Sequence, residues 1–221
     1  MSNGADKGAE LLDCLIRGGE KAVAEFGDLS GGEWFDEAPE YFLTTYLASS
    51  VRKLEKTTVL LEVHVGATRK EAGAYRRGRP AKNERRNGRF DLVVYWANGK
   101  PRGAIEVKSP LWIVDEKKLG ADFIELCKCI SANDDSSFQF TAFVYYASVS
   151  HPKQKHDNSS EKLRELVDKV HKRAEISAKE LDLVAKSWPG SIHRGKGDCD
   201  DAWCVAAIVF VRKHGERSFR R

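Results

Sequence analysis

The sequence FDLVVY at residues 90–95 is followed by AIEVK at residues 104–108, and the pair Asn98-Gly99 lies between them. Both runs are rich in apolar and β-branched residues, which is typical of strands. An Asn-Gly pair between two such runs favours a β-hairpin, because a type I′ turn needs positive φ angles at both of its central residues. The stretch therefore predicts two antiparallel strands joined by a tight turn.

The register of this hairpin decides which side chains meet. If Asn98 and Gly99 form the turn, the numbers of paired residues add to 197, and Asp91 lies opposite Glu106. The Cβ atoms of such a pair are roughly 4.5 to 5.5 Å apart. Lys108 returns to the face of Glu106, because side chains alternate along a strand. The other face is apolar and is predicted to belong to the core: Leu92, Val94, Trp96, Ile105 and Val107.

Two carboxylates directly opposite each other destabilise a sheet. A hard divalent cation removes that repulsion, and Mg²⁺ is usually held by one or two carboxylates together with waters and substrate phosphates. Asp91 and Glu106 are therefore candidate metal ligands. The alternative is that both acids lie on a solvated face, where Lys108 neutralises them.

The arrangement resembles the PD-(D/E)XK nuclease superfamily, which has the restriction-endonuclease-like fold. That family carries an acid on its second core strand, and Glu or Asp, one residue and Lys on its third; the matching positions are Asp91, Glu106 and Lys108. The resemblance implies that both acids and the Val107 carbonyl bind one or two Mg²⁺ ions, for which Mn²⁺ can substitute. It implies that Lys108 orients or deprotonates the attacking water, or stabilises developing charge. Many members add a metal-proximal glutamate on the first core helix, where Glu40 is the candidate; a first-turn acid favoured by the helix dipole is the alternative.

The family core runs helix, three strands, helix, strand, and the sequence predicts this order between residues 38 and 147. Apolar residues at 43, 47, 51 and 54 follow a helical period after Pro39, which suits a first helical turn. We therefore expect an α/β, restriction-endonuclease-like αβββαβ core with a central mixed sheet flanked by helices. The elements after this first helix are predicted at residues 57–65, 89–96, 103–108, 119–131 and 138–147.

The other residues are predicted to extend this core within a single domain (1–221), because the chain is long enough for one α/β core with additions. Residues 1–35 are expected to form an N-terminal helical extension around a short helix at 11–16. Residues 158–212 are expected to form a C-terminal extension. It contains a helical region at 160–187 and a strand at 203–211 that joins the sheet.

Positive charge is concentrated in one segment. Residues 69–89 contain nine Lys and Arg and two Glu, a net charge of +7, whereas the whole chain carries only +4. The segment is predicted to be a loop between the first two core strands, where basic side chains can bind phosphates and release counterions. A solvated loop without a partner is the alternative. The candidate nucleic-acid-binding residues are Arg69, Lys70, Arg76, Arg77, Arg79, Lys82, Arg85, Arg86 and Arg89.

Composition favours a soluble, cytoplasmic protein. No apolar run reaches the roughly 18 residues of a membrane helix, and no signal peptide opens the chain. The five cysteines are odd in number, which fits a reducing compartment better than a disulfide framework. A zinc site is a weaker alternative, because the spacing of its candidate ligands matches none of the usual pairs. Those ligands would be Cys127, Cys129, Cys199 and Cys204.

The function expected from the resemblance and the charge is Mg²⁺-dependent hydrolysis of phosphodiester bonds in DNA, by an endonuclease of the restriction, repair or defence type. We expect double-stranded DNA as the partner, and cutting both strands would favour a homodimer. One alternative is a catalytically inactive nuclease-fold module that binds nucleic acid or a protein, although all three motif residues are intact. Another is an RNA-binding protein with a basic arm, which no aromatic recognition motif supports.

Overall fold

The computed structural model describes residues 6–75, 87–112, 115–152, 158–195 and 199–219. These residues form one mixed sheet with the strand order β1-β2-β3-β4-β7-β5, and β6 pairs with β7. The strands are β1 (Thr58–His64), β2 (Arg89–Tyr95), β3 (Pro101–Leu111), β4 (Phe140–Pro152), β5 (Leu183–Pro189), β6 (His193–Arg194) and β7 (Cys199–Arg212).

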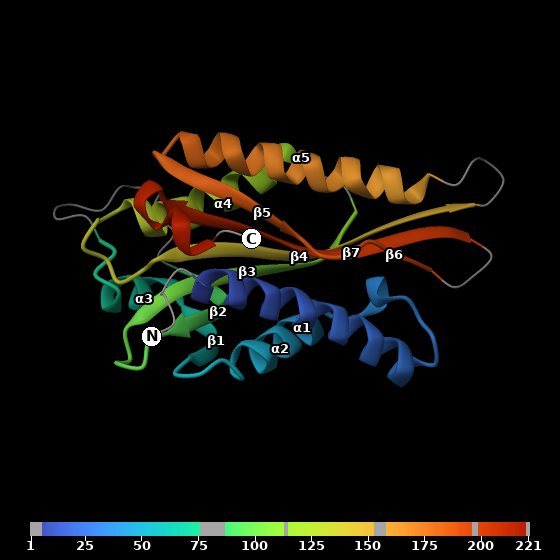
Figure 1. Cartoon of the computed structure of the whole chain (residues 1–221), viewed down its shortest axis with the longest axis horizontal. Coiled ribbons are helices and arrows are strands. Elements are labelled where there is room, and N and C mark those ends of the chain that lie inside the picture. Colours follow the sequence, from blue (N-terminus) through green and yellow to red (C-terminus); the bar gives the residue numbers. More distant parts are fainter. Residues whose placement is uncertain (1–5, 76–86, 113–114, 153–157, 196–198, 220–221) are drawn as a thin grey trace.

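Helices cover both faces of the sheet (Figure 1). The α-helices are α1 (Asp6–Ser30), α2 (Glu40–Val51), α3 (Val65–Glu71), α4 (Glu116–Ser131) and α5 (Ser159–Lys179), and short 3₁₀ helices are η1 (Phe35–Glu37) and η2 (Lys213–Phe219). Side chains of α1 and α2 pack on one face, and those of α4 and α5 pack on the other. The predicted α/β class, with a mixed sheet flanked by helices, is confirmed.

The predicted order of elements appears as α2, β1, β2, β3, α4 and β4. The first three strands pair antiparallel, and β3 pairs parallel with β4. The predicted loop between β1 and β2 is wrong at its start, because α3 occupies residues 65–71. His64 begins this helix: its Nδ1 accepts a hydrogen bond from Ala67 N at 3.4 Å, and its carbonyl accepts one from Thr68 Oγ1 at 2.9 Å.

The hairpin between β2 and β3 has the predicted register but a different turn. Leu92 pairs with Ile105, so the numbers of paired residues add to 197 as expected. The turn is longer than two residues, because Trp96 N donates a hydrogen bond to Lys100 O at 2.9 Å. Within this turn the positive φ angle belongs to Gly99, at 77°. The predicted type I′ turn at Asn98-Gly99 is therefore wrong.

A bulge in β3 restores the register. Tyr95 pairs with Pro101 and Val94 pairs with Gly103, so Arg102 is an extra residue on β3. The longer turn shifts the pairing by one residue, and the bulge shifts it back. Two departures from the predicted hairpin thus cancel before the strand reaches its acidic residues.

The N-terminal extension is one long helix and not a short one. Helix α1 has 25 residues and contains Gly18 and Gly19, which suggested a break from sequence. Both glycines permit close packing instead. A Cβ atom at Gly18 would lie 2.6 Å from Ser50 Oγ of α2, and one at Gly19 would lie 2.6 Å from Val205 Cγ1 of β7.

The C-terminal extension is part of the same sheet. The predicted helical region at 160–187 is wrong beyond Lys179, where α5 ends and a separate strand, β5, follows. Asp182 lies between them with a φ angle of 58°, a left-handed conformation that stops the helix. The predicted strand at 203–211 does join the sheet, and β7 lies between β4 and β5.

Strands β4 and β7 lie inside the sheet, so both of their faces belong to the core. Side chains alternate between two apolar clusters: Phe143 and Tyr145 face α4 and α5, whereas Val144 and Tyr146 face α1 and α2. All four side chains are at most 3% exposed. Among the described helices, none combines the length and apolar character that crossing a membrane requires.

Candidate functional site

Asp91 and Glu106 meet where β2 and β3 run side by side. The register that pairs Leu92 with Ile105 brings the next residues, Asp91 and Glu106, opposite each other. Asp91 Oδ2 accepts a hydrogen bond from Val107 N at 2.6 Å. This bond ties the carboxylate of one strand to the backbone of the other, so the position of Asp91 is fixed by the hairpin itself.

The pKa of Asp91 is raised above its ordinary value. Burial is the largest cause, and the negative charges of Glu40 and Glu62 raise the pKa further. Hydrogen bonds from the Val107 backbone and with the Glu106 side chain lower it, but they do not reverse the shift. The negative charges of Glu40 and Glu62 thus both act on the Asp91 carboxylate.

Glu40 is brought to the same place by α2. It is the first residue of that helix, directly after Pro39 at the N-cap. Its Oε2 accepts hydrogen bonds from Lys108 Nζ at 3.1 Å and from Ser109 N at 3.0 Å. The Lys108 and Glu40 side chains are 45% and 37% exposed, so both can reach a ligand.

Glu62 is an acid of this cluster that the sequence analysis missed. Strand β1 pairs Leu61 with Leu92 and Val63 with Phe90, which places Glu62 level with Asp91. Its φ angle is 53°, a rare conformation for a residue with a side chain. Such strain is often kept at functional sites. The available signal was that Glu62 is the one acid of β1, but the register of β1 could not be read from sequence.

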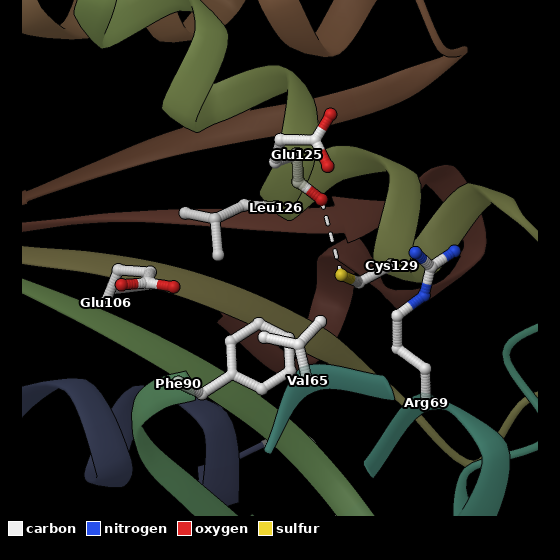
Figure 2. Close-up of a pocket in the computed structure, with 7 residues that line it drawn as sticks. All are labelled: Val65, Arg69, Phe90, Glu106, Glu125, Leu126 and Cys129. Carbon is white, nitrogen blue, oxygen red and sulfur yellow. Dashed lines mark hydrogen bonds between the residues drawn. The ribbon is translucent and has the colours of Figure 1, made fainter. Parts of the chain in front are cut away.

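Glu106 borders a small pocket on the α4 side of the sheet (Figure 2). Val65, Phe90 and Leu126 form its apolar wall. The polar lining comes from Arg69, Glu125 and Cys129, and Cys129 Sγ donates a hydrogen bond to the Glu125 carbonyl at 3.3 Å. Figure 2 shows Glu106 and Arg69 on opposite sides of Val65 and Phe90.

The basic segment is described only in part. Arg69 is 1% exposed, because α3 buries it against the pocket, and its guanidinium lies over the Tyr75 ring. Its predicted role in binding nucleic acid needs correction, since a phosphate cannot reach a buried side chain. Lys70 and Arg89 are exposed. The remaining candidates, Arg76, Arg77, Arg79, Lys82, Arg85 and Arg86, lie outside the described residues.

Metal-binding geometry is not preformed in this arrangement. Among the residues that the structure describes, no group of three or more His, Cys, Asp or Glu side chains is placed to hold a metal ion. Among the described residues, Cys127, Cys129 and Cys204 belong to no such group; all three are buried free thiols, and burial raises the pKa of Cys204 to about 12. The side chain of Cys199 lies outside the described residues.

The chain has no match among known protein families, curated proteins or solved structures. Its function therefore has to follow from its own residues. Those that the structure brings together are Glu40, Glu62, Asp91, Glu106 and Lys108, which come from α2, β1, β2 and β3.

Proposed function

We propose that this protein is a metal-dependent nuclease that hydrolyses phosphodiester bonds in DNA on a restriction-endonuclease-like core. The observation that carries the proposal is the meeting of several acids from different elements beside one lysine. Burial and the repulsion from Glu40 and Glu62 raise the pKa of Asp91. A divalent cation would turn this repulsion into attraction.

The donor chemistry fits Mg²⁺, with Mn²⁺ as a substitute. Carboxylate oxygens are the ligands that hard cations take, and Mg²⁺ keeps several waters besides. A carboxylate has about four acceptor sites, so the bonds from Val107 N to Asp91 and from Ser109 N to Glu40 orient these groups without exhausting them. Asp91 and Glu106 would hold the ion, together with the Val107 carbonyl and with Glu40 or Glu62. When bound, the ion would supply a nucleophilic hydroxide and neutralise charge on the phosphate.

In this proposal Lys108 binds the scissile phosphate. Its ammonium pairs with Glu40 at 3.1 Å, and the Lys108 side chain is 45% exposed. Exposed ion pairs are weak, typically below about 1 kcal/mol, so an entering phosphate can take over the lysine. Lys108 would then hold a phosphate oxygen or the attacking water beside the carboxylates. The exposed Lys70 and Arg89 would add affinity through backbone phosphates.

The test is cleavage of plasmid, linear duplex and single-stranded DNA, with RNA alongside. We expect cleavage with Mg²⁺ or Mn²⁺ and none with EDTA or with Ca²⁺ alone. Lys108→Ala and Glu106→Ala should each abolish turnover and leave the melting temperature nearly unchanged, because Lys108 is exposed and Glu106 is only partly buried. Lys213→Ala is the matched control, since Lys213 also forms an exposed ion pair, with Asp182, but lies elsewhere. Equal cleavage by all four proteins would contradict the proposal.

One observation favours a second candidate, a module that binds nucleic acid without cutting it. The described part of the chain has no preformed group of metal ligands, and Glu40 is already paired with Lys108. A protein that binds DNA but cleaves none of the four substrates with either metal would support this alternative.

A further inference from the structure

Lys108 also lines an open groove between the end of β3 and the start of α4. The groove has a volume of about 330 Å³, near the lower end of the range of roughly 300 to 1,000 Å³ in which small ligands bind. Its apolar lining includes the buried side chains of Leu119 from α4 and Phe143 from β4, and Trp112 and Lys118 line it too. Because Lys108 belongs to both places, the groove continues the candidate active site on the α4 side of the sheet.

Trp112 is the feature of this groove that most needs an explanation. Its side chain is 58% exposed, whereas the other tryptophans of the described chain are buried or partly buried. Its exposed ring lies in a groove that also has apolar lining, so it offers a flat stacking surface to a ligand. Lys108 and Lys118 line the same groove, so the groove offers two ammonium groups as well as the ring.

The acids of the groove do not cancel this chemistry. Asp115 is the N-cap of α4, and its Oδ1 accepts hydrogen bonds from Lys117 N and Lys118 N at 3.1 Å each. Its charge is therefore directed at the helix N-terminus and not at a ligand. Asp122 also lines the groove, and its side chain is not free, because it already interacts with another group of the protein.

An aromatic ring, an apolar lining and two lysines suit a nucleotide, whose base stacks while its phosphates pair with cations. Base stacking on aromatic side chains tolerates every sequence, because each base has a π face. In a duplex both faces of a base are already stacked, so a base can enter the groove only if it is unpaired or extruded.

We propose that Trp112 stacks on an unpaired nucleobase next to the phosphate held by Lys108. The preferred substrate is then single-stranded DNA, or DNA with an unpaired segment at the cleavage position, in place of the continuous duplex expected from sequence. This inference rests on the proposed nuclease function, since it takes Lys108 as the phosphate-binding group.

The test is equilibrium binding without turnover. In EDTA, fluorescence anisotropy measures the affinity for a labelled oligothymidine of twelve nucleotides and for a duplex of the same length. Trp112→Ala should weaken binding of the single strand by about five- to 150-fold, the range for losing one stacked base. Trp112→Phe should retain most of the affinity, and duplex binding should change by less than about twofold. Tyr41→Ala is the matched control, because Tyr41 is 54% exposed and lies on α2, on the other face of the sheet.

The binding and cleavage results together distinguish failure of the Trp112 stacking site from failure of the nuclease function. Unchanged single-strand binding in Trp112→Ala, or an equal loss for duplex and single strand, would overturn the stacking site. If the wild type still cleaves DNA and Lys108→Ala does not, the nuclease function survives that result. Conversely, Trp112-dependent binding of the single strand without any cleavage would support the base site and contradict the nuclease.

Discussion

The β4–β7 part of the sheet and the β1–β3 part differ in the burial and the charge of their side chains. Strands β4 and β7 pair over 13 residues of β4, and the core positions of both strands are almost completely buried. Strand β1 has mostly exposed residues, including Leu60 at 48%, and β1, β2 and β3 carry the clustered acids. The β4–β7 part thus provides stability. The β1–β3 part can therefore hold like charges together at a tolerable loss of stability.

The largest expected effect comes from a core deletion on the β4–β7 side. Phe210 of β7 is completely buried and packs against Phe123 of α4, with ring centroids 5.4 Å apart. Phe210→Ala should lower the free energy of unfolding by about 3 to 5 kcal/mol, because the cavity cannot fully collapse. Leu60→Ala in β1 should lower it by less than about 1 kcal/mol. Urea unfolding measures both, and similar losses would refute the contrast between the two parts.

A smaller effect is expected from the backbone strain at Glu62. Replacement by glycine removes both a like charge beside Asp91 and the penalty of a positive φ angle, each of which opposes folding. We expect Glu62→Gly to be as stable as the wild type or more stable by about 1 kcal/mol, and to cleave DNA more slowly. Lys56→Gly is the control for strain alone, since Lys56 has a φ angle of 57°. Full activity in Glu62→Gly would remove Glu62 from the site.

The smallest effect is the pH dependence of stability due to Asp91. An acid whose pKa is raised by folding stabilises the protein while it is protonated, below its unfolded pKa of roughly 3.9. This contribution is lost as the pH rises through the raised folded pKa. Without metal, the wild type should therefore lose stability relative to Asp91→Asn as the pH increases from about 4. Parallel stability curves across that range would show that Asp91 is not perturbed.

The two parts of the sheet also differ in how well their elements could be predicted from the sequence. Local signals were sufficient for the hairpin, α2 and the buried strands, because each has a clear apolar period. The hairpin register was correct although its turn was not, since the bulge at Arg102 compensates for the longer turn. Glu40 was a candidate from the resemblance, and the structure shows its contact with Lys108.

The features that could not be predicted depend on contacts between residues far apart in the sequence. The register of β1, and with it the position of Glu62, depends on contacts across residues 65–88. The apolar residues of β5 also fit a helical period after α5, and only pairing with β7 makes them a strand. The burial of Arg69 follows from α3, which hides a charged residue that sequence assigns to the surface.

Thermal melts of the wild type and Asp91→Asn, each in EDTA and in Mg²⁺, test whether Asp91 shares a divalent cation with neighbouring acids. In EDTA, Asp91→Asn should be at least as stable as the wild type, because the amide keeps the bond from Val107 N and removes repulsion. In Mg²⁺ the wild type should gain about 2.7 kcal/mol at a hundredfold excess over Kd, and the variant much less.

Asp134→Asn serves as the control for the substitution itself, since the Asp134 side chain is 94% exposed. It should respond to Mg²⁺ as the wild type does. Mg²⁺ should reverse the order of the melting temperatures of the wild type and Asp91→Asn. Equal increases for both proteins would mean that Asp91 binds no cation, and would contradict the proposed site.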